Sequence, residues 1–430
     1  MKIKTKALLE YICWFLILLV PFNYTIINKL YFSSVFMLGS IIIAIVILFL
    51  MHFKRKITKK QVFLFLIMVF IIFIEFFDNY YIKQGRILNV ILFNVYLMIP
   101  FVLSFYRCCE VKKIYKILEI FLMEHIIATI FVQIFPNFYS NSIIKWIADG
   151  DLTTLSLLKY WHNEGYNAGL TAHYSTNGIY LAIAFIYYFV ELVQNKNKKN
   201  MILMILAFIT LMLTGKRAQA LFSIIACFCV YLYNKREGFS KKFLNTGIII
   251  FSFFILIYVV SMFVPQVLNV VNRFEEAAGN KSELLTGREL LYDTSITNWK
   301  KHVLFGNGWG FFSEYYQNYI YNPSSAYYNI KYIDDHNVYL QLLCETGIVG
   351  LVCFLILEII VVFKEFKIEK KLSTKKENSV LFLLGYNIFF VLYCFSGNPL
   401  YDIQCYALFF ILIGVLVMYE NVSEKIDNKE

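Results

Sequence analysis

The stretch HNVYLQLLCETGIVGL, from His336 to Leu351, places a histidine at the start of a long apolar run. The run continues to about residue 363, which is long enough for a helix that crosses a membrane. A polar segment that contains Arg288 and a glycine-rich turn precedes the histidine. An ordinary membrane helix does not need this arrangement, whereas a site for a charged, lipid-linked substrate at the membrane surface does.

The composition of the whole chain agrees with a membrane protein. Of the 430 residues, 59% are hydrophobic and 16% are charged, whereas soluble proteins average about 45–50% and about 25%. The sequence predicts an all-α integral membrane protein, 1–430, that forms a single polytopic domain. It has about twelve transmembrane helices, roughly at 8–22, 31–53, 61–77, 87–106, 114–135, 171–193, 201–214, 218–233, 243–264, 338–363, 379–397 and 400–419.

The basic residues predict the orientation of these helices. Most of the 40 Lys and Arg residues fall in alternate connections, as in KRKITKK (54–60) and KIEKKLSTKK (367–376). Since cytoplasmic connections are enriched in Lys and Arg, both termini are expected in the cytoplasm. The net charge of +11 therefore indicates topology and contact with anionic membrane lipid, and it does not indicate nucleic acid. No outer connection contains a cysteine, so no disulfide framework is expected.

The longest connection is predicted to be a large extracytoplasmic loop, 265–337, between the ninth and tenth spans, and to carry part of the active site. Thr286 and Glu289 fit a capping box at the start of a helix. An apolar face of Tyr292, Ile296, Trp299 and Val303 predicts that this helix lies at the membrane interface. The turn FGNGWGFF (305–312) follows, and its glycines permit close backbone approach.

Basic residues in two separate segments are candidate anion ligands. Arg288 lies in the first turn of the predicted helix, where a bound anion offsets the unfavourable cation, and the alternative is an arginine paired with Glu289, Asp293 or lipid phosphate. Lys216 and Arg217 lie in the turn of LTGKRAQALF (213–222), on the outer side, where basic residues are rare. Charges near membrane depth usually have a partner or a function, and contact with lipid phosphate is the alternative.

His336 is the candidate base, because imidazole accepts protons near neutral pH. A capping role at the helix start is the alternative, and a metal site made with Asp334 and Asp335 is disfavoured, since three adjacent ligands rarely converge. Glu345 in the tenth span either lines a polar cavity or packs helices. The run GLTAHYSTNGIYLAI contains His173 and Asn177 and predicts either a carbohydrate-contacting rim or an interfacial helix start.

In LTGKRAQALF, in TGRELLYDTSITNWKKHVLFGNGWGFF and in DDHNVYLQLLCETGIVGL, the chain resembles the O-antigen ligase and polysaccharide polymerase family of bacterial integral membrane glycosyltransferases. The resemblance implies that Arg217 and Arg288 bind the diphosphate of an undecaprenyl-diphosphate-linked oligosaccharide and that His336 activates the acceptor hydroxyl. It further implies substrate contacts from Lys216, Asn337, Gly308, Trp309, His173 and Asn177. It implies metal-independent catalysis without a cofactor, in the bacterial cytoplasmic membrane.

These observations predict a polymerase that joins lipid-linked repeat units on the outer face of the membrane, for capsule, exopolysaccharide or O-antigen. A flippase and a chain-length regulator are its expected partners. The first alternative is a ligase that transfers a finished glycan to a lipid or protein acceptor. A transporter of lipid-linked sugars is disfavoured, because its polar residues are expected at the membrane midplane. In this chain they gather at the outer helix ends.

Overall fold

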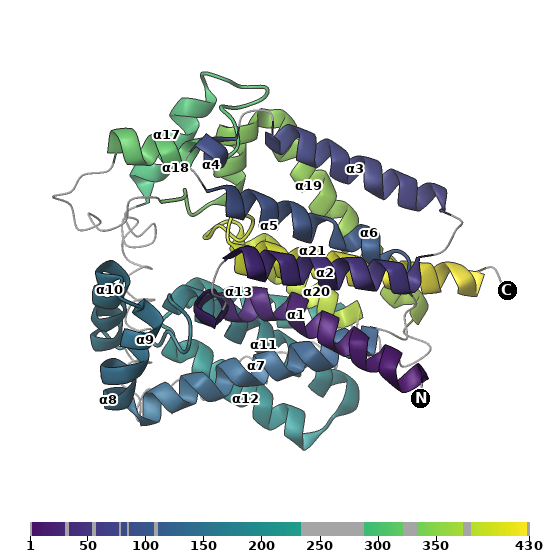
Figure 1. The fold of residues 1–430 in the computed structure, drawn as a ribbon, viewed down its shortest axis with the longest axis horizontal. Coiled ribbons are helices and arrows are strands. Elements are labelled where there is room, and N and C mark those ends of the chain that lie inside the picture. Colours follow the sequence, from purple (N-terminus) through teal and green to yellow (C-terminus); the bar gives the residue numbers. More distant parts are fainter. Residues whose placement is uncertain are drawn as a thin grey trace.

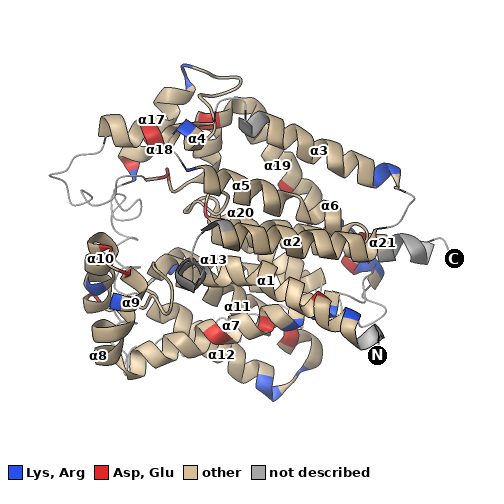
Figure 2. Ribbon diagram, in the orientation of Figure 1, with Lys and Arg blue, Asp and Glu red and all other residues tan. Residues whose placement is uncertain are grey.

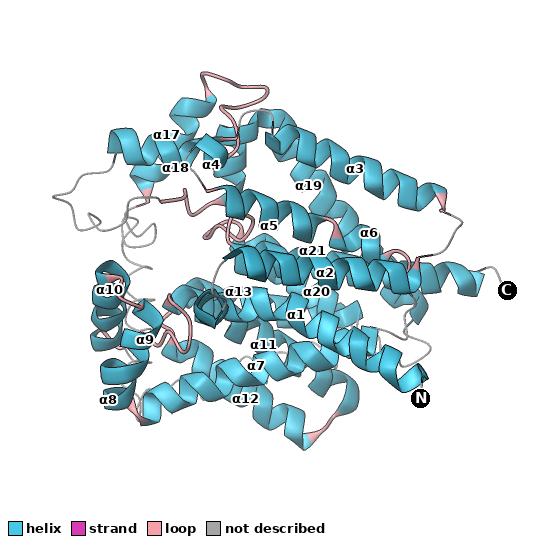
Figure 3. Cartoon of the chain, in the orientation of Figure 1, coloured by secondary structure: helices cyan, strands magenta, loops and turns pink. Residues whose placement is uncertain are grey.

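The structure is a computed structural model that describes residues 2–30, 34–53, 57–76, 79–83, 86–106, 111–233, 288–320, 333–372 and 380–427. Within these ranges all regular elements are helices (Figure 3). The longer ones are α1 (Lys2–Leu30), α2 (Ser34–His52), α3 (Lys59–Phe76), α5 (Ile87–Leu97), α7 (Val111–Ile134), α10 (Leu152–Asn163), α11 (Tyr174–Asn195), α12 (Lys198–Leu213), α13 (Arg217–Tyr233), α17 (Glu289–Trp299), α19 (Val338–Leu372), α20 (Val380–Tyr393) and α21 (Ile403–Asp427).

Short helices connect these elements. They are α4 (Tyr80–Lys83), α6 (Ile99–Leu103), α8 (Pro136–Phe138), η2 (Tyr139–Ile143), α9 (Ile144–Ala148), α18 (Phe311–Tyr315) and η3 (Tyr316–Ile320). Most of them, together with α10 and α17, gather at the end of the bundle opposite the two chain termini (Figure 1). The described part of the long loop predicted at 265–337 therefore contains helices, α17 and α18, which lie at this end of the bundle.

The centre of the bundle is α11, because every residue from Asn177 to Val190 is buried. It packs against α7, α12, α13 and α20, and α21 packs against α5, α6 and α1. Peripheral helices expose large apolar side chains, as Phe63 and Phe70 of α3 and Phe363 of α19 show. In Figure 2 the charged segments lie mostly near helix ends. This distribution suits helices whose outer faces contact lipid.

Five described helices are long and apolar enough to cross a membrane: Thr5–Asn23, Val111–Ile134, Tyr174–Asn195, Val338–Leu372 and Ile403–Asn421. Shorter apolar helices cover Phe36–His52, Ile87–Leu103, Arg217–Tyr233 and Val380–Tyr393. The all-α membrane architecture is confirmed. The predicted ninth span, 243–264, lies outside the described residues, so the count of twelve and the position of the long loop after it stay predictions.

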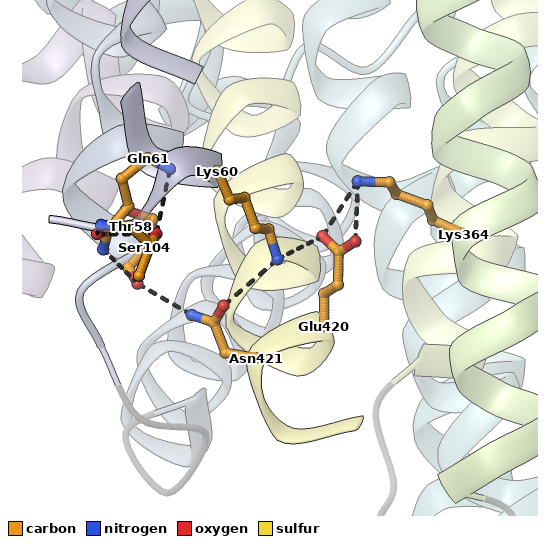
Figure 4. Close-up of polar contacts among 7 residues, drawn as sticks. All are labelled: Thr58, Lys60, Gln61, Ser104, Lys364, Glu420 and Asn421. Atoms are coloured by element: carbon orange, nitrogen blue, oxygen red, sulfur yellow. Dashed lines mark hydrogen bonds and ion pairs between the residues drawn. The ribbon is translucent and has the colours of Figure 1, made fainter. Parts of the chain in front are cut away.

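The N- and C-termini lie at the same end of the bundle (Figure 1). At this end Glu420 of α21 pairs with Lys60 of α3 at 2.8 Å and with Lys364 of α19 at 3.0 Å (Figure 4). Next to it, the Asn421 amide donates to the backbone oxygen of Ser104 at 2.9 Å. Three elements that are far apart in sequence are therefore joined by one carboxylate, at the end away from α17.

Candidate functional site

The helix α19 is broken at Gly347, whose φ of 66° and ψ of −168° are not helical. The break leaves backbone groups without helical hydrogen-bond partners, and residues 303–308 form hydrogen bonds with these groups. The amides of Ile348 and Val349 donate to the carbonyl oxygens of Val303 and Leu304. In return the amides of Asn307 and Gly308 donate to the carbonyl oxygens of Cys344 and Glu345. The glycine-rich turn is thus fixed to α19 by its backbone.

This pairing explains two of the glycines. A Cβ on Gly306 would lie 2.3 Å from the backbone carbon of Glu345, and a Cβ on Gly347 would lie 2.3 Å from the backbone oxygen of Leu304. Both residues also have positive φ, at 68° and 66°. Since a side chain fits neither the space nor the conformation, the close approach of turn and helix requires glycine at both positions.

Glu345 holds the other half of the turn. Its carboxylate is 1% exposed and accepts the amides of Gly310 (2.9 Å) and Phe312 (3.1 Å). It also accepts the hydroxyl of Tyr401 (2.9 Å) and the side-chain amide of Gln341 (3.2 Å). The sequence left open whether Glu345 lines a cavity or packs helices. The structure gives it a structural role, as the acceptor that fastens the turn to the membrane helix.

Trp309 and Gly308 were predicted as substrate contacts. Trp309 is half-buried and stacks on Tyr401, with ring centroids 4.8 Å apart, and it also contacts Phe93. Gly308 donates to the carbonyl oxygen of Glu345 at 2.8 Å. Both residues therefore take part in the docking of the turn, and their contact with substrate stays a prediction.

Arg288 lies at the N-cap of α17, one residue before the helix begins at Glu289. Its guanidinium donates from Nη1 to the backbone oxygen of Ser396 at 2.9 Å, which fixes it against the segment after α20. The predicted capping residue Thr286 lies outside the described residues. The buried residues of α17 are Leu291, Ser295 and Asn298, whereas Tyr292, Ile296 and Trp299 of the predicted apolar face are half-buried. The helix ends at Trp299, so Val303 lies beyond it, and the location of α17 at the membrane interface stays a prediction.

The segment before α19 is fixed by its neighbours on both sides. Asp335 is fully buried, and its carboxylate accepts the hydroxyl of Ser295 of α17 at 2.8 Å. Its amide donates to the side chain of Gln341 at 3.1 Å. Asn337 caps α19, because its side-chain oxygen accepts the amide of Leu340 at 3.1 Å. His336 between them is half-buried and has a φ of 59°, a conformation that costs about 1 kcal/mol or more in most residues.

Lys216 lies in the tight turn between α12 and α13, where Gly215 has a φ of 72°. A Cβ on Gly215 would lie 2.4 Å from the ring of Tyr166, so the turn needs glycine there. The Lys216 ammonium lies 4.3 Å from the centroid of the Tyr174 ring, a cation–π contact. Arg217 is the first residue of α13 and is half-buried.

The charges of this site act on one another. Burial first, and then the charges of Arg288 and Lys216, lower the pKa of His336 to about 3. Burial and the charge of Arg288 lower the pKa of Lys216 to about 7. Three residues from three separate segments thus interact electrostatically, and we call Lys216, Arg288 and His336 the cationic cluster after its two cations. The role that the resemblance implies for Arg217 stays a prediction.

His173 lies beside this cluster, at the N-cap of α11. Burial first, then Lys216 and His336, lower its pKa to about 3. Its Nδ1 accepts the amide of Ser175 at 3.0 Å, which requires an unprotonated Nδ1. Its ring stacks on Tyr174 with a centroid distance of 4.7 Å, and Trp161 of α10 packs edge-on to it at 4.4 Å. The neutral ring is therefore part of an aromatic wall next to the cations.

Two buried amides support this arrangement from within the bundle. Asn177 has no exposed surface, and its side chain donates to Thr129 at 2.9 Å and to the backbone oxygen of Asn167 at 3.1 Å. The predicted substrate contact of Asn177 is therefore not supported by its position, because its amide joins α11 to α7 and to the segment before α11. Sequence analysis missed Gln219, which donates from α13 to the backbone oxygen of Ser175 (3.0 Å) and to the hydroxyl of Tyr393 (3.3 Å).

In the ranges that the structure describes, no group of three or more His, Cys, Asp or Glu residues could hold a metal ion. Metal-independent chemistry stays a prediction of the sequence.

Residues 202–355 match the model of the O-antigen ligase family. The predicted resemblance is thereby confirmed over the part of the chain that carries Lys216, Arg288 and His336. Among curated proteins none matches the chain.

Proposed function

We propose that this protein polymerises undecaprenyl-diphosphate-linked oligosaccharide repeat units on the outer face of the bacterial cytoplasmic membrane. The observation that carries the proposal is the cationic cluster, in which Lys216 and Arg288 flank a neutral imidazole at the start of a membrane helix. A diphosphate needs cations, and an acceptor hydroxyl needs a base. The cluster supplies both within one small region.

The donor side of the reaction concerns the leaving group. As the bond between the anomeric carbon and the diphosphate oxygen breaks, the electron pair stays on that oxygen. Fixed cations that face the developing charge stabilise it more in a dehydrated site than in water. Arg288 is held in place by the backbone oxygen of Ser396 and Lys216 by the Tyr174 ring, so little rearrangement is needed. Arg217, at the start of α13, is an additional candidate for contact with the diphosphate.

The acceptor side concerns the proton. His336 takes the proton of the attacking hydroxyl as the new bond to the anomeric carbon forms, and inversion at that carbon follows from attack opposite the leaving group. Burial and the neighbouring cations lower the pKa of His336 to about 3 before the donor binds. A bound diphosphate compensates these cations, which raises the basicity of the imidazole when the donor is present. The base is therefore strengthened by its own substrate.

Other residues line this proposed path. His173, Trp309 and Gly308 are proposed to contact the sugars. Asn337 caps α19 directly after His336. A flippase and a chain-length regulator remain the expected partners.

The pH dependence of donor binding tests the role of Lys216. Because its pKa is lowered to about 7, Lys216 is mostly charged below pH 7 and mostly neutral above it before the donor binds. An anion binds the charged form, and donor affinity should fall about tenfold for each pH unit above 7. In the Lys216→Arg variant the guanidinium stays charged, and this loss should disappear. Donor dissociation constants measured at pH 6.5, 7.5 and 8.5 test this, and a pH-independent wild type contradicts it.

The ligase is the second candidate function, since the O-antigen ligase match covers both activities. The discriminating assay uses purified protein in lipid vesicles with the lipid-diphosphate-linked repeat unit of the host, and products are separated by size. A polymerase gives a ladder of products, and Arg288→Ala abolishes it. Single transfer only after a lipid or protein acceptor is added assigns the ligase instead. Failure to consume the donor under both conditions rejects both functions.

A further inference from the structure

A second group of polar residues surrounds Glu345 on the same end of the bundle. The Gln341 amide that donates to Glu345 also donates to Asp334, at 3.0 Å. Tyr401, which donates to the same carboxylate, precedes Asp402 in the chain. The third donor, Gly310, lies against the ring of Tyr81, because a Cβ on it would be 3.1 Å from that ring. The Glu345 carboxylate thus holds together the segments that contain Gln341, Tyr401 and Gly310.

Arg86 completes this group. Its guanidinium carbon lies 4.5 Å from the centroid of the Tyr81 ring. Burial first, then the charges of Asp334, Glu345 and Asp402, raise the pKa of the Tyr81 hydroxyl, and Arg86 lowers it. These charges therefore surround one phenol. Asp402 is exposed, and Asp334 and Arg86 are half-buried, so the group reaches solvent.

A buried donor without a partner lies at the same place. The side-chain oxygen of Asn79 accepts the amide of Tyr81 at 2.9 Å, and Asn79 is 4% exposed. Among the described residues its amide nitrogen has no hydrogen-bond partner. A buried unpaired donor costs about 1–3 kcal/mol, so this position favours an acceptor oxygen from a ligand. We call Asn79, Tyr81, Arg86, Asp334 and Asp402 the second polar cluster.

The second polar cluster and the cationic cluster adjoin the same short segment. Asp334 is two residues before His336 in the chain. Burial raises the pKa of Asp335 to about 7; the hydrogen bond from Ser295 opposes this rise, Asp334 adds to it, and Arg288 opposes it. The segment 334–336 therefore adjoins two different regions. One contains the cations Lys216 and Arg288. The other contains three carboxyl groups, from Asp334, Asp402 and the buried Glu345, and one guanidinium, from Arg86.

We propose that the second polar cluster binds the non-reducing end of the acceptor saccharide. This inference rests on the proposed transferase function. Sugar hydroxyls are neutral donors and acceptors, which suit the carboxylates, the guanidinium and the unpaired Asn79 amide. Burial raises the pKa of Asp334, and that of Asp402 to about 7, so from neutral pH upward the ionised carboxylates repel a diphosphate and direct the donor to the other side of His336. These carboxylates also disfavour an acidic terminal sugar, which makes the cluster a determinant of specificity for neutral or amino sugars.

The test separates acceptor binding from donor binding. Asp334→Asn and Asp402→Asn are measured with the lipid-linked repeat unit as donor and the same oligosaccharide, released from its lipid, as acceptor. Loss of a hydrogen bond to a charged group should raise the acceptor KM about 10–100-fold, with the donor dissociation constant changed less than about threefold. Asp293→Asn, an exposed carboxylate on α17, is the matched control and should leave both constants unchanged.

The outcomes are distinct from those of the proposed function. If both variants leave the acceptor KM unchanged, or if they weaken the donor instead, the acceptor assignment is wrong while the transferase remains. If the wild-type protein transfers no sugar to any acceptor, the transferase itself is wrong. An acceptor whose terminal sugar carries a carboxylate provides a second measurement. It should bind more weakly than its neutral analogue to the wild type, and the difference should shrink in Asp402→Asn.

Discussion

Replacement of His336 by alanine should lower kcat about 10²–10⁴-fold, the contribution of a positioned general base. The donor dissociation constant should not increase, because His336 is neutral and its removal leaves Arg288 and Lys216 in place. Removal of a proton acceptor affects the transition state, in which the hydroxyl proton moves, more than it affects the bound donor. Single-turnover rates at saturating donor, combined with equilibrium donor binding, measure the two effects separately.

The backbone of His336 requires a second variant. Its φ of 59° is a conformation that asparagine tolerates better than most residues. His336→Asn therefore keeps the local backbone but has no basic nitrogen. It should be as inactive as His336→Ala if the base is the cause, and it should recover activity if the backbone is the cause. His302→Ala removes an exposed histidine beyond α17 and should retain wild-type kcat.

Replacement of Glu345 by alanine should have the largest effect on stability. Four donors, from Gly310, Phe312, Tyr401 and Gln341, lose their acceptor inside the protein. At about 1–3 kcal/mol for each buried unpaired group, the loss exceeds about 4 kcal/mol. That is a large fraction of the roughly 5–15 kcal/mol that stabilises a folded protein. The apparent melting temperature in detergent should fall by at least about 5 °C.

Two further variants define the cause of this loss. Glu345→Gln keeps one acceptor oxygen and should lie between the wild type and Glu345→Ala. Val352→Ala removes a side chain from the same helix that is 45% exposed, and it should change the melting temperature little. If Glu345→Ala melts like the wild type, the glycine-rich turn is held by its backbone pairing with α19 alone.

The sequence was sufficient for the helical membrane architecture, because hydrophobicity over about 20 consecutive residues is a local property. It also identified Arg288, Lys216 and His336 as candidates, through short motifs that the O-antigen ligase match covers. It did not predict the contacts between segments. Ser295 of α17 is buried and donates to Asp335, and the backbone oxygen of the buried Asn298 accepts the side-chain amide of Asn307. Hydrophobic periodicity does not report such partners.

The surroundings of Lys216 and the role of Glu345 were decided by the tertiary structure. Lys216 and Arg217 are adjacent in the chain, and the turn at Gly215 places Lys216 over Tyr174 while Arg217 begins α13. Glu345 meets the turn 305–312 because α19 breaks at Gly347 and exchanges backbone hydrogen bonds with residues about 40 positions earlier. The sequence by itself determined which segments are helical and which carry reactive side chains. Their convergence depended on hydrogen bonds between segments that are distant in the chain, which no local pattern encodes.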